Sequence, residues 1–199
     1  MFLIQYTIYM KSVIAIIAAI LAVFGNVPYL RDVIKGKVQP HPYTWLVWSL
    51  VSCIAFFGQV AKGAGIGALP TAASEIFTIF IFILSLKYGF KNISKRDTLF
   101  LFIALTGIIP WIITKDPTLS VIIAVSIDLI AFIPTLGKTW RYPKTEMPML
   151  YGMNVLRHIL TLFSLEAYNI ATTLHSIAMI ITNSLMTGFI IIKRTIKEY

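Results

Sequence analysis

The sequence predicts an all-α polytopic membrane protein, with seven transmembrane helices arranged as two parallel three-helix bundles joined by a spacer helix. Three observations support this prediction: an apolar composition, seven apolar runs and an internal repeat. Of the 199 residues, 58% are hydrophobic and 13% are charged, whereas soluble domains contain roughly 45–50% apolar residues. We expect the first repeat over residues 1–90, the spacer over 91–116 and the second repeat over 117–199.

Charged residues divide the first half of the chain into four runs that can cross a bilayer, which takes about 17–25 mostly apolar residues as helix. Residues 11–31 and 37–62 enclose uncharged runs, and so do residues 97–115. The third run, 62–87, is interrupted by Glu75. The first ten residues are expected to extend the first helix or to lie at the membrane interface.

The second half of the chain contains three further runs of this length. Residues 116–138 contain Asp128, residues 146–166 contain Arg157, and residues 166–193 are free of charge between their ends. Seven helices therefore account for nearly every residue, and no soluble domain is left over.

The net charge of +9 follows from where the basic residues lie between the predicted helices. If the seven predicted helices are numbered in chain order, thirteen Lys or Arg residues lie in the connections 1–2, 3–4 and 5–6 and in the C-terminal tail. The opposite side holds only Lys11, Lys62 and Lys115. Positive residues favour the cytoplasmic side. We therefore expect an integral multi-pass protein with its N-terminus outside and its C-terminus in the cytoplasm, bound to lipid and not to nucleic acid.

An internal repeat appears when the chain is shifted by 106 residues. Pro28 then falls on Pro134, Pro42 falls on Pro148, and the predicted helix ends coincide. Three helices, one spacer and three more helices make the two triplets run in the same direction. Parallel repeats of this kind are a known transporter design, with the substrate site near the bilayer midplane between the halves.

This plan resembles the PQ-loop and SWEET superfamily, which has three helices, a spacer and three more helices, with an outside N-terminus. The proline-glutamine pair that names PQ-loop proteins is absent, because Pro28 precedes Tyr29 and Pro134 precedes Thr135. The resemblance implies an alternating-access transporter. It also implies that Asn183 binds substrate hydroxyls, although its repeat counterpart is Phe77.

Four prolines are candidate hinges. Pro28 and Pro134 lie inside predicted helices, where the missing hydrogen bond produces a kink. Pro42 and Pro148 match the prolines that SWEET transporters carry on their second and sixth helices. These two also lie at helix starts, where proline is an ordinary first-turn residue.

Four polar residues share one depth. Asp128, Asn183, Glu75 and Arg157 each lie ten to twelve residues from a cytoplasmic charge, which is roughly 15–18 Å along a helix and about half of the apolar core. Ionisable groups at this depth turn toward the bundle interior and pair. We expect this layer to form the functional site.

The charges of this layer favour an ion pair between Asp128 and Arg157, because a short connection joins their helices. Glu75 would then be the group that carries a proton, although the two acids could exchange roles. Alternatively, Asp128 and Arg157 form a structural pair that moves nothing. An aspartate on the fifth helix couples transport to protons in some PQ-loop amino-acid exporters, and Asp128 matches that position.

Neutral polar residues at helical spacing extend the candidate site. Tyr151, Asn154 and His158 form one stripe, and Ser176 and Asn183 belong to another. The alternative is ordinary hydrogen bonding between helices.

Two tryptophans lie on the second predicted helix. We expect Trp45 in the aromatic belt at the interface and Trp48 in the cavity, where its ring would stack on a sugar or a nicotinamide.

The sequence therefore predicts a transporter of a small polar solute: sugar-like, an amino acid or a vitamin, with proton linkage left open. A receptor or sorting protein of the same fold is the alternative, and an intramembrane enzyme is a third. Enzyme motifs, cofactor motifs and metal-ligand pairs are absent from the sequence, so we expect no enzyme, no cofactor and no metal. A homo-oligomer is left open.

Overall fold

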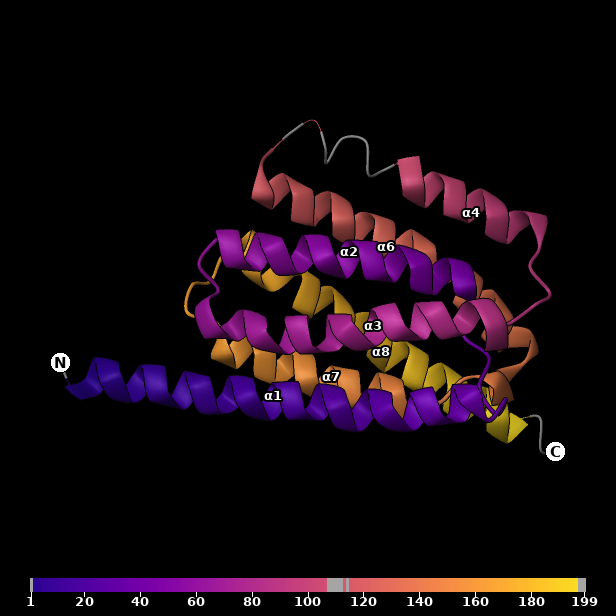
Figure 1. The fold of residues 1–199 in the computed structure, drawn as a ribbon, viewed down its shortest axis with the longest axis horizontal. Coiled ribbons are helices and arrows are strands. Elements are labelled where there is room, and N and C mark those ends of the chain that lie inside the picture. The colour runs from indigo at the N-terminus through magenta and orange to yellow at the C-terminus, as the bar shows by residue number, and fades with distance from the viewer. Residues whose placement is uncertain (1, 107–112, 114, 197–199) are drawn as a thin grey trace.

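The computed structural model describes residues 2–106, 113 and 115–196, and every regular element within them is helical (Figure 1). The α-helices are α1 (Phe2–Ile34), α2 (Pro42–Ala61), α3 (Leu69–Tyr88), α4 (Lys95–Thr106), α6 (Pro117–Arg141), α7 (Pro148–Ser164) and α8 (Ile170–Ile196). Two 3₁₀ helices, η1 (Gly65–Ala68) and η2 (Pro143–Thr145), lie in connections. Residues 107–112 and 114 of the predicted spacer lie outside the described residues. The helical prediction is confirmed.

Five described helices are long and apolar enough to cross a membrane: α1, α2, α3 together with η1, α6 and α8. Helix α7 has 17 residues, including Arg157 and His158, and the described part of α4 has 12 residues. The chain thus has the helices of an integral multi-pass membrane protein, and crossing by α4 and α7 stays a prediction.

Helix starts follow local sequence chemistry. The Asp116 carboxylate accepts hydrogen bonds from the N–H groups of Thr118 and Leu119, at 2.7 and 3.1 Å, and caps α6. These bonds lower the pKa of Asp116, because they stabilise its charged form. Ser94 and Asp97 form a reciprocal capping box before α4.

The four candidate hinge prolines lie where the sequence places them. Pro28 and Pro134 lie inside α1 and α6, both of which continue as single helices through the proline. Pro42 and Pro148 occupy the first turns of α2 and α7, where the absence of an N–H group costs nothing. A hinge role stays a prediction for all four.

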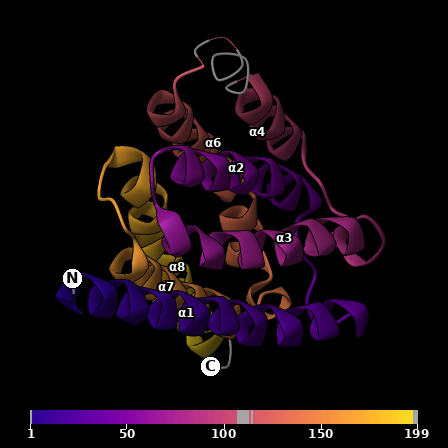
Figure 2. The ribbon, with the colours of Figure 1, turned by 60° about the vertical axis from the view of Figure 1, so that its left-hand side comes forward.

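The helices pack in two sets, each with its third helix in the middle. Helix α3 contacts α1 and α2, while α8 contacts α6 and α7. Between the sets, α1 contacts α7 and α2 contacts α6, with smaller contacts of α2 with α8 and of α3 with α7 (Figure 2). Helix α4 lies outside, against α6 and α2.

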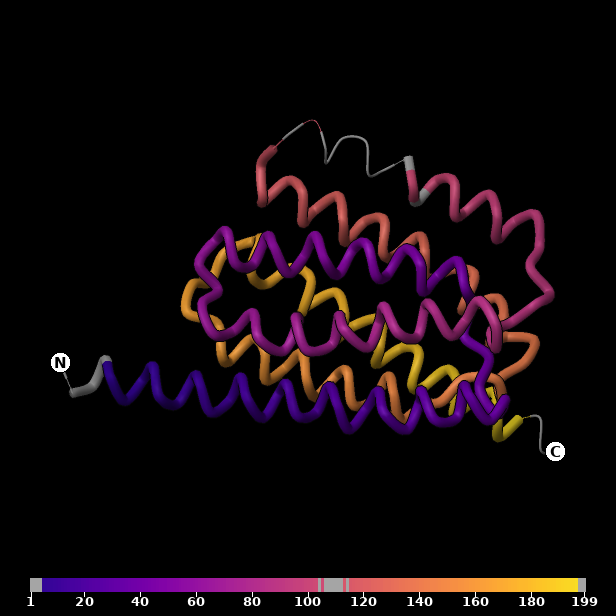
Figure 3. The backbone as a smooth tube through the Cα atoms, in the orientation of Figure 1, coloured from indigo at the N-terminus to yellow at the C-terminus, as the bar shows by residue number. Residues whose placement is uncertain are grey.

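The connections gather at two opposite ends of the bundle, as the backbone tube shows (Figure 3). At one end, Gln39 N–H donates to Thr145 O and Phe90 N–H to Pro40 O, both at 3.0 Å. This end carries the basic connections. At the other end, Asn169 Nδ2 donates to Lys62 O at 3.1 Å. We call them the basic end and the opposite end; which of them faces the cytoplasm stays a prediction.

Glycine allows two close approaches. A Cβ atom on Gly58 would lie 2.4 Å from Val121 Cγ2, so glycine lets α2 pack directly on α6. A Cβ atom on Gly67 would lie 2.8 Å from the Cα atom of Leu165, which brings η1 against the α7–α8 connection. Small residues at helix interfaces commonly serve this purpose in membranes.

Helix α1 extends past the opposite end of the bundle (Figure 1). Its Lys11 Nζ donates to Leu165 O at 2.6 Å, whereas Tyr6, Ile8 and Tyr9 are exposed. Of the two expectations for the N-terminal residues, the structure thus has the continuation of the first helix.

Candidate functional site

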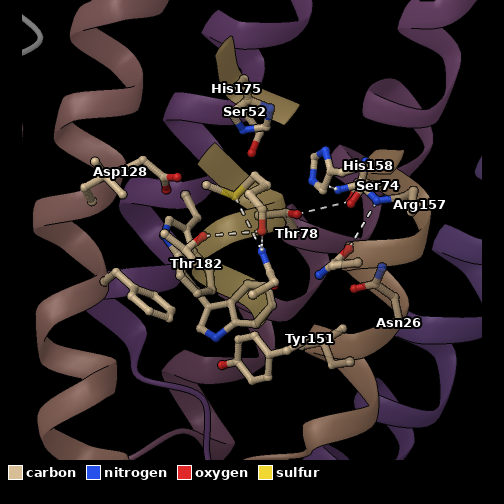
Figure 4. Close-up of a pocket in the computed structure, with 18 residues that line it drawn as sticks. Asn26, Ser52, Ser74, Thr78, Asp128, Tyr151, Arg157, His158, His175 and Thr182 are labelled. Carbon is tan, nitrogen blue, oxygen red and sulfur yellow. Dashed lines mark hydrogen bonds between the residues drawn. The ribbon is translucent and has the colours of Figure 1, made fainter. Parts of the chain in front are cut away.

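A cavity of about 60 Å³ lies inside the bundle and is lined by all the described α-helices except α4. Helices α1, α2 and α3 contribute Asn26, Trp45, Trp48, Ser52, Ser74 and Thr78. Helices α6, α7 and α8 contribute Asp128, Leu129, Phe132, Leu150, Tyr151, Asn154, Arg157, His158, His175, Met179, Thr182 and Asn183. Figure 4 shows polar side chains from both sets around this space.

Most residues of the predicted site line this cavity. Five of the predicted binding residues and both members of the predicted ion pair are among them: Trp48, Tyr151, Asn154, His158, Asn183, Asp128 and Arg157. Glu75 and Ser176 are buried but do not line it. Of the four residues that depth along the sequence placed in one layer, Asp128, Asn183 and Arg157 thus line one cavity.

Arg157 is held by its own helix and by the chain at the start of α3. Its Nε donates to Asn154 Oδ1 at 3.1 Å, and its Nη1 donates to Pro70 O at 3.4 Å. Its Nη2 lies 2.6 Å from His158 Nε2. Because arginine has no acceptor, His158 Nε2 must accept this bond.

The bond from Arg157 fixes the protonation of His158. With Nε2 as the acceptor, the ring is neutral and carries its proton on Nδ1. That Nδ1 lies 3.3 Å from Ser176 Oγ and donates to it. Ser176, predicted to bind substrate, therefore orients His158 from outside the cavity wall.

Asp128 does not pair with Arg157. Neither Asp128 nor Arg157 takes part in an ion pair among the described residues, and no hydrogen bond to the Asp128 carboxylate occurs in that part of the chain. The side chain is 3% exposed and points into the cavity from α6, while Arg157 approaches from the opposite side (Figure 4). The expected direct ion pair is therefore wrong, because the two side chains reach one cavity from opposite sides and do not meet.

Glu75 lies between α3 and α2, next to the cavity lining. Its Oε1 accepts from Cys53 Sγ at 3.5 Å, while its Oε2 is buried without a hydrogen-bond partner among the described residues. Its neighbours Ser74 and Thr78 reach the cavity instead. Glu75, which the sequence predicts to carry a proton, therefore lies beside the cavity and not in its lining.

Aromatic rings form one wall. The rings of Trp48 and Phe132 stack with centroids 5.7 Å apart, and the ring of Trp45 meets Trp48 edge-on at 5.1 Å. Trp45 is 3% exposed and belongs to the buried core, so its predicted place in an interfacial belt is wrong. Packing against Tyr29 and Trp48 turns it inward.

A buried polar network closes the basic end below the cavity. Lys138 of α6 pairs with Glu146, which is fully buried. The hydroxyls of Tyr29 and Tyr151 donate to Glu146 Oε2 at 3.2 and 3.1 Å. Tyr151 also lines the cavity, so this network, here called the basic-end network, extends from the cavity toward the basic end.

His41 lies beside this network, just before α2. Neither ring nitrogen has a hydrogen-bond partner among the described residues, and Nε2 lies 3.6 Å from Asp97 Oδ2. Burial lowers the pKa of His41 to about 4 and Lys138 contributes to the lowering, against the opposing attraction of Asp97. The ring is therefore neutral near pH 7.

Several residues that line the cavity were not predicted from the sequence. Asn26 sits in an apolar run two residues before Pro28 and belongs to no polar stripe. His175 lies one residue before Ser176 and packs edge-on against His158, with ring centroids 5.5 Å apart. Ser74 stands four residues before Thr78 on α3, and that spacing was the available indication that the two share a face.

Within the part of the chain that the structure describes, no group of three or more His, Cys, Asp or Glu side chains could hold a metal ion. Comparison of the chain with protein-family models, with curated proteins and with solved structures found no match in any of the three.

Proposed function

We propose that this protein is a membrane transporter for a small polar solute and works by alternating access between two three-helix repeats. The observation that carries the proposal is the position of the cavity: it is buried and polar, and both helix sets line it. Substrate sites of transporters built from parallel repeats lie between the repeats in this way.

The pattern of helix neighbours supports the repeat. Exchanging α1 with α6, α2 with α7 and α3 with α8 turns every contact among these six helices into another observed contact. The contact of α1 with α7 becomes that of α6 with α2, and the contact of α2 with α8 becomes that of α7 with α3. Rocking one set against the other would open a site between the two sets to each side of the membrane in turn.

The basic-end network supports a closed route on one side. Tyr151 lines the cavity, and its hydroxyl and that of Tyr29 both donate to Glu146. These contacts join α1 of one set to α7 of the other through Glu146. A solute leaving toward the basic end would require them to separate. Pro28, one residue from Tyr29, and Pro134, four residues from Lys138, lie where that movement would bend the helices.

Uptake by liposomes containing the purified protein tests the proposal. A panel of labelled sugars, amino acids and vitamins should include a solute that equilibrates across the protein-containing vesicles and not across empty ones. Replacing Asn183 by Ala should weaken its uptake, since Asn183 lines the cavity. Saturable binding without flux would favour the receptor alternative and contradict the transporter.

The same vesicles test proton linkage. An imposed pH gradient should drive uptake above equilibrium if Asp128 or Glu75 carries a proton, and the replacement Asp128→Asn or Glu75→Gln should then abolish the driven part alone. Uptake that ignores the gradient would mark the transporter as facilitative.

A further inference from the structure

The cavity is lined by a buried carboxyl group and a buried guanidinium group that do not pair with each other. Asp128 and Arg157 are 3% and 4% exposed and line the same space, yet they form no ion pair with each other or with any other described residue. Burying an unpaired charge within the membrane is energetically unfavourable, and ionisable residues at that depth commonly line ligand pathways. Both therefore call for a partner that enters the cavity.

Arg157 keeps donors for such a partner. A guanidinium has five N–H donors, and three are used by Asn154 Oδ1, Pro70 O and His158 Nε2. All three acceptors are uncharged, so they orient the guanidinium without neutralising it. The remaining donors, one on each terminal nitrogen, suit a carboxylate, which accepts two parallel bonds.

The Asp128 wall has the opposite character. Phe132 follows Asp128 by one helical turn and stacks on Trp48 with ring centroids 5.7 Å apart, and both rings line the same cavity as the carboxylate. A carboxylate beside aromatic rings favours an ammonium group, which both attract. No lysine or arginine among the described residues bonds to Asp128.

We propose that the cavity binds a small zwitterion, with its ammonium group at Asp128 and its carboxylate at Arg157. The inference rests on the proposed function in one respect: it takes this cavity as the substrate site. A neutral sugar would leave both Asp128 and Arg157 buried without a charged partner, and a simple cation would leave Arg157 without one. A zwitterion compensates both and brings no net charge with it.

Ligand stabilisation of the purified protein tests the proposal. The probes are the twenty L-amino acids and glycine betaine, each measured by thermal shift beside glucose and nicotinamide riboside. At least one zwitterion should raise the melting temperature. Its analogues lacking only the carboxylate or only the ammonium group should bind roughly 10- to 100-fold more weakly, as expected for loss of one charged hydrogen-bonding group.

Two variants assign the ends of the ligand. Asp128→Asn should reduce affinity for the zwitterion to that of its analogue without the ammonium group, and leave binding of that analogue unchanged. Arg157→Gln should do the same with the analogue without the carboxylate. Glu166→Gln and Arg96→Gln remove one charge each from exposed positions away from the cavity, and should bind like the unmodified protein.

The ligand selectivity of the unmodified protein tests the zwitterion proposal even if a variant fails to fold. Stabilisation by glucose or nicotinamide riboside and by no zwitterion overturns the proposal, and so does equal binding of the zwitterion and both analogues. An Asp128→Asn variant that keeps full zwitterion affinity also overturns it. Uptake of a sugar would leave the transporter standing without this inference, whereas zwitterion binding without uptake would do the reverse.

Discussion

At the residue scale, Lys138 and Glu146 form a pair in which each charge depends on the other. Removing one partner of a buried pair costs about 3–5 kcal/mol, because the other charge stays buried and unpaired. We expect Lys138→Met to lower the free energy of unfolding by about this amount. The double variant Lys138→Met with Glu146→Gln should recover most of the loss, because the amide oxygen still accepts from Tyr29 and Tyr151.

Denaturant unfolding in detergent would measure this cycle. Lys144→Met, at an exposed position near the same end, serves as the control and should change stability by less than about 0.5 kcal/mol. A double variant as unstable as the sum of its two single variants would mean that Lys138 and Glu146 are not energetically coupled.

His41 gives the fold a specific dependence on pH. Burial lowers its pKa to about 4, so between about pH 6.5, the ordinary pKa of histidine, and pH 4 the unfolded chain binds a proton that the folded chain does not. Stability contributed by neutral His41 is therefore complete above pH 6.5 and is lost as the pH falls toward 4. The slope approaches about 1.4 kcal/mol per pH unit.

Comparison with His41→Gln isolates this term, because the other titrating groups cancel in the difference. The stability of the unmodified protein, measured by denaturant unfolding, should decline more steeply than that of the variant between pH 6.5 and 4. Parallel curves would show that His41 is accessible to protons in the folded state.

At the scale of the helix, Gly58 decides how closely α2 approaches α6. Gly58→Ala would put a Cβ atom 2.4 Å from Val121 Cγ2, and such overpacking typically costs about 1–3 kcal/mol. Adding Val121→Ala removes the clashing methyl group and should restore part of the stability, as thermal unfolding would show. A similar loss in both variants would mean that backbone strain, and not this contact, limits the site.

Gly137→Ala provides the matched control for this pair. Gly137 is also in a helix, but a Cβ atom there would meet nothing within 4 Å. Alanine should be neutral or stabilise α6 by up to about 1 kcal/mol through its higher helix propensity.

Helix boundaries were the part of the fold best predicted from sequence, because local chemistry sets them. Pro42 and Pro148 begin α2 and α7, and Asp116 with Pro117 begins α6. Side-chain direction was less predictable, since it depends on how each helix is rotated against its neighbours. Depth along the chain placed Asp128 and Arg157 in one layer, but their failure to pair became visible only in three dimensions.

Long-range polar contacts limited the prediction of the site in the same way. Glu146 marked only the start of a predicted helix, and it bonds to Tyr29, 117 residues away in sequence. Asn26 had only Tyr29 at helical spacing, in an otherwise apolar run that hid it. The sequence therefore identified most of the charged centre of the cavity, but not the network beneath it.

At the scale of the whole molecule, the arrangement of the ends predicts which connections share a side of the membrane. Single cysteines can test this in a Cys53→Ala background, because Cys53 is the only native cysteine. Lys91→Cys should be protected from a membrane-impermeant thiol reagent added outside cells, and Lys115→Cys should react. Opening the membrane should make Lys91→Cys reactive, which controls for local burial.

Labelling of both positions from the same side would mean that the segment between α3 and α6 does not cross, and would contradict the prediction of seven spans. Labelling of Lys91→Cys alone from outside would keep seven spans but reverse the predicted orientation.

Helix α1 determines how the protein matches its membrane. Its 33 residues measure roughly 50 Å, whereas the 20 residues of α2 measure roughly 30 Å, the thickness of a typical apolar core. The excess lies beyond Lys11, where exposed Tyr6 and Tyr9 suit the headgroup region. A thicker bilayer would therefore cover more of α1 but would exceed the length of the shorter helices around it. The resulting hydrophobic mismatch would favour membranes of ordinary or low thickness.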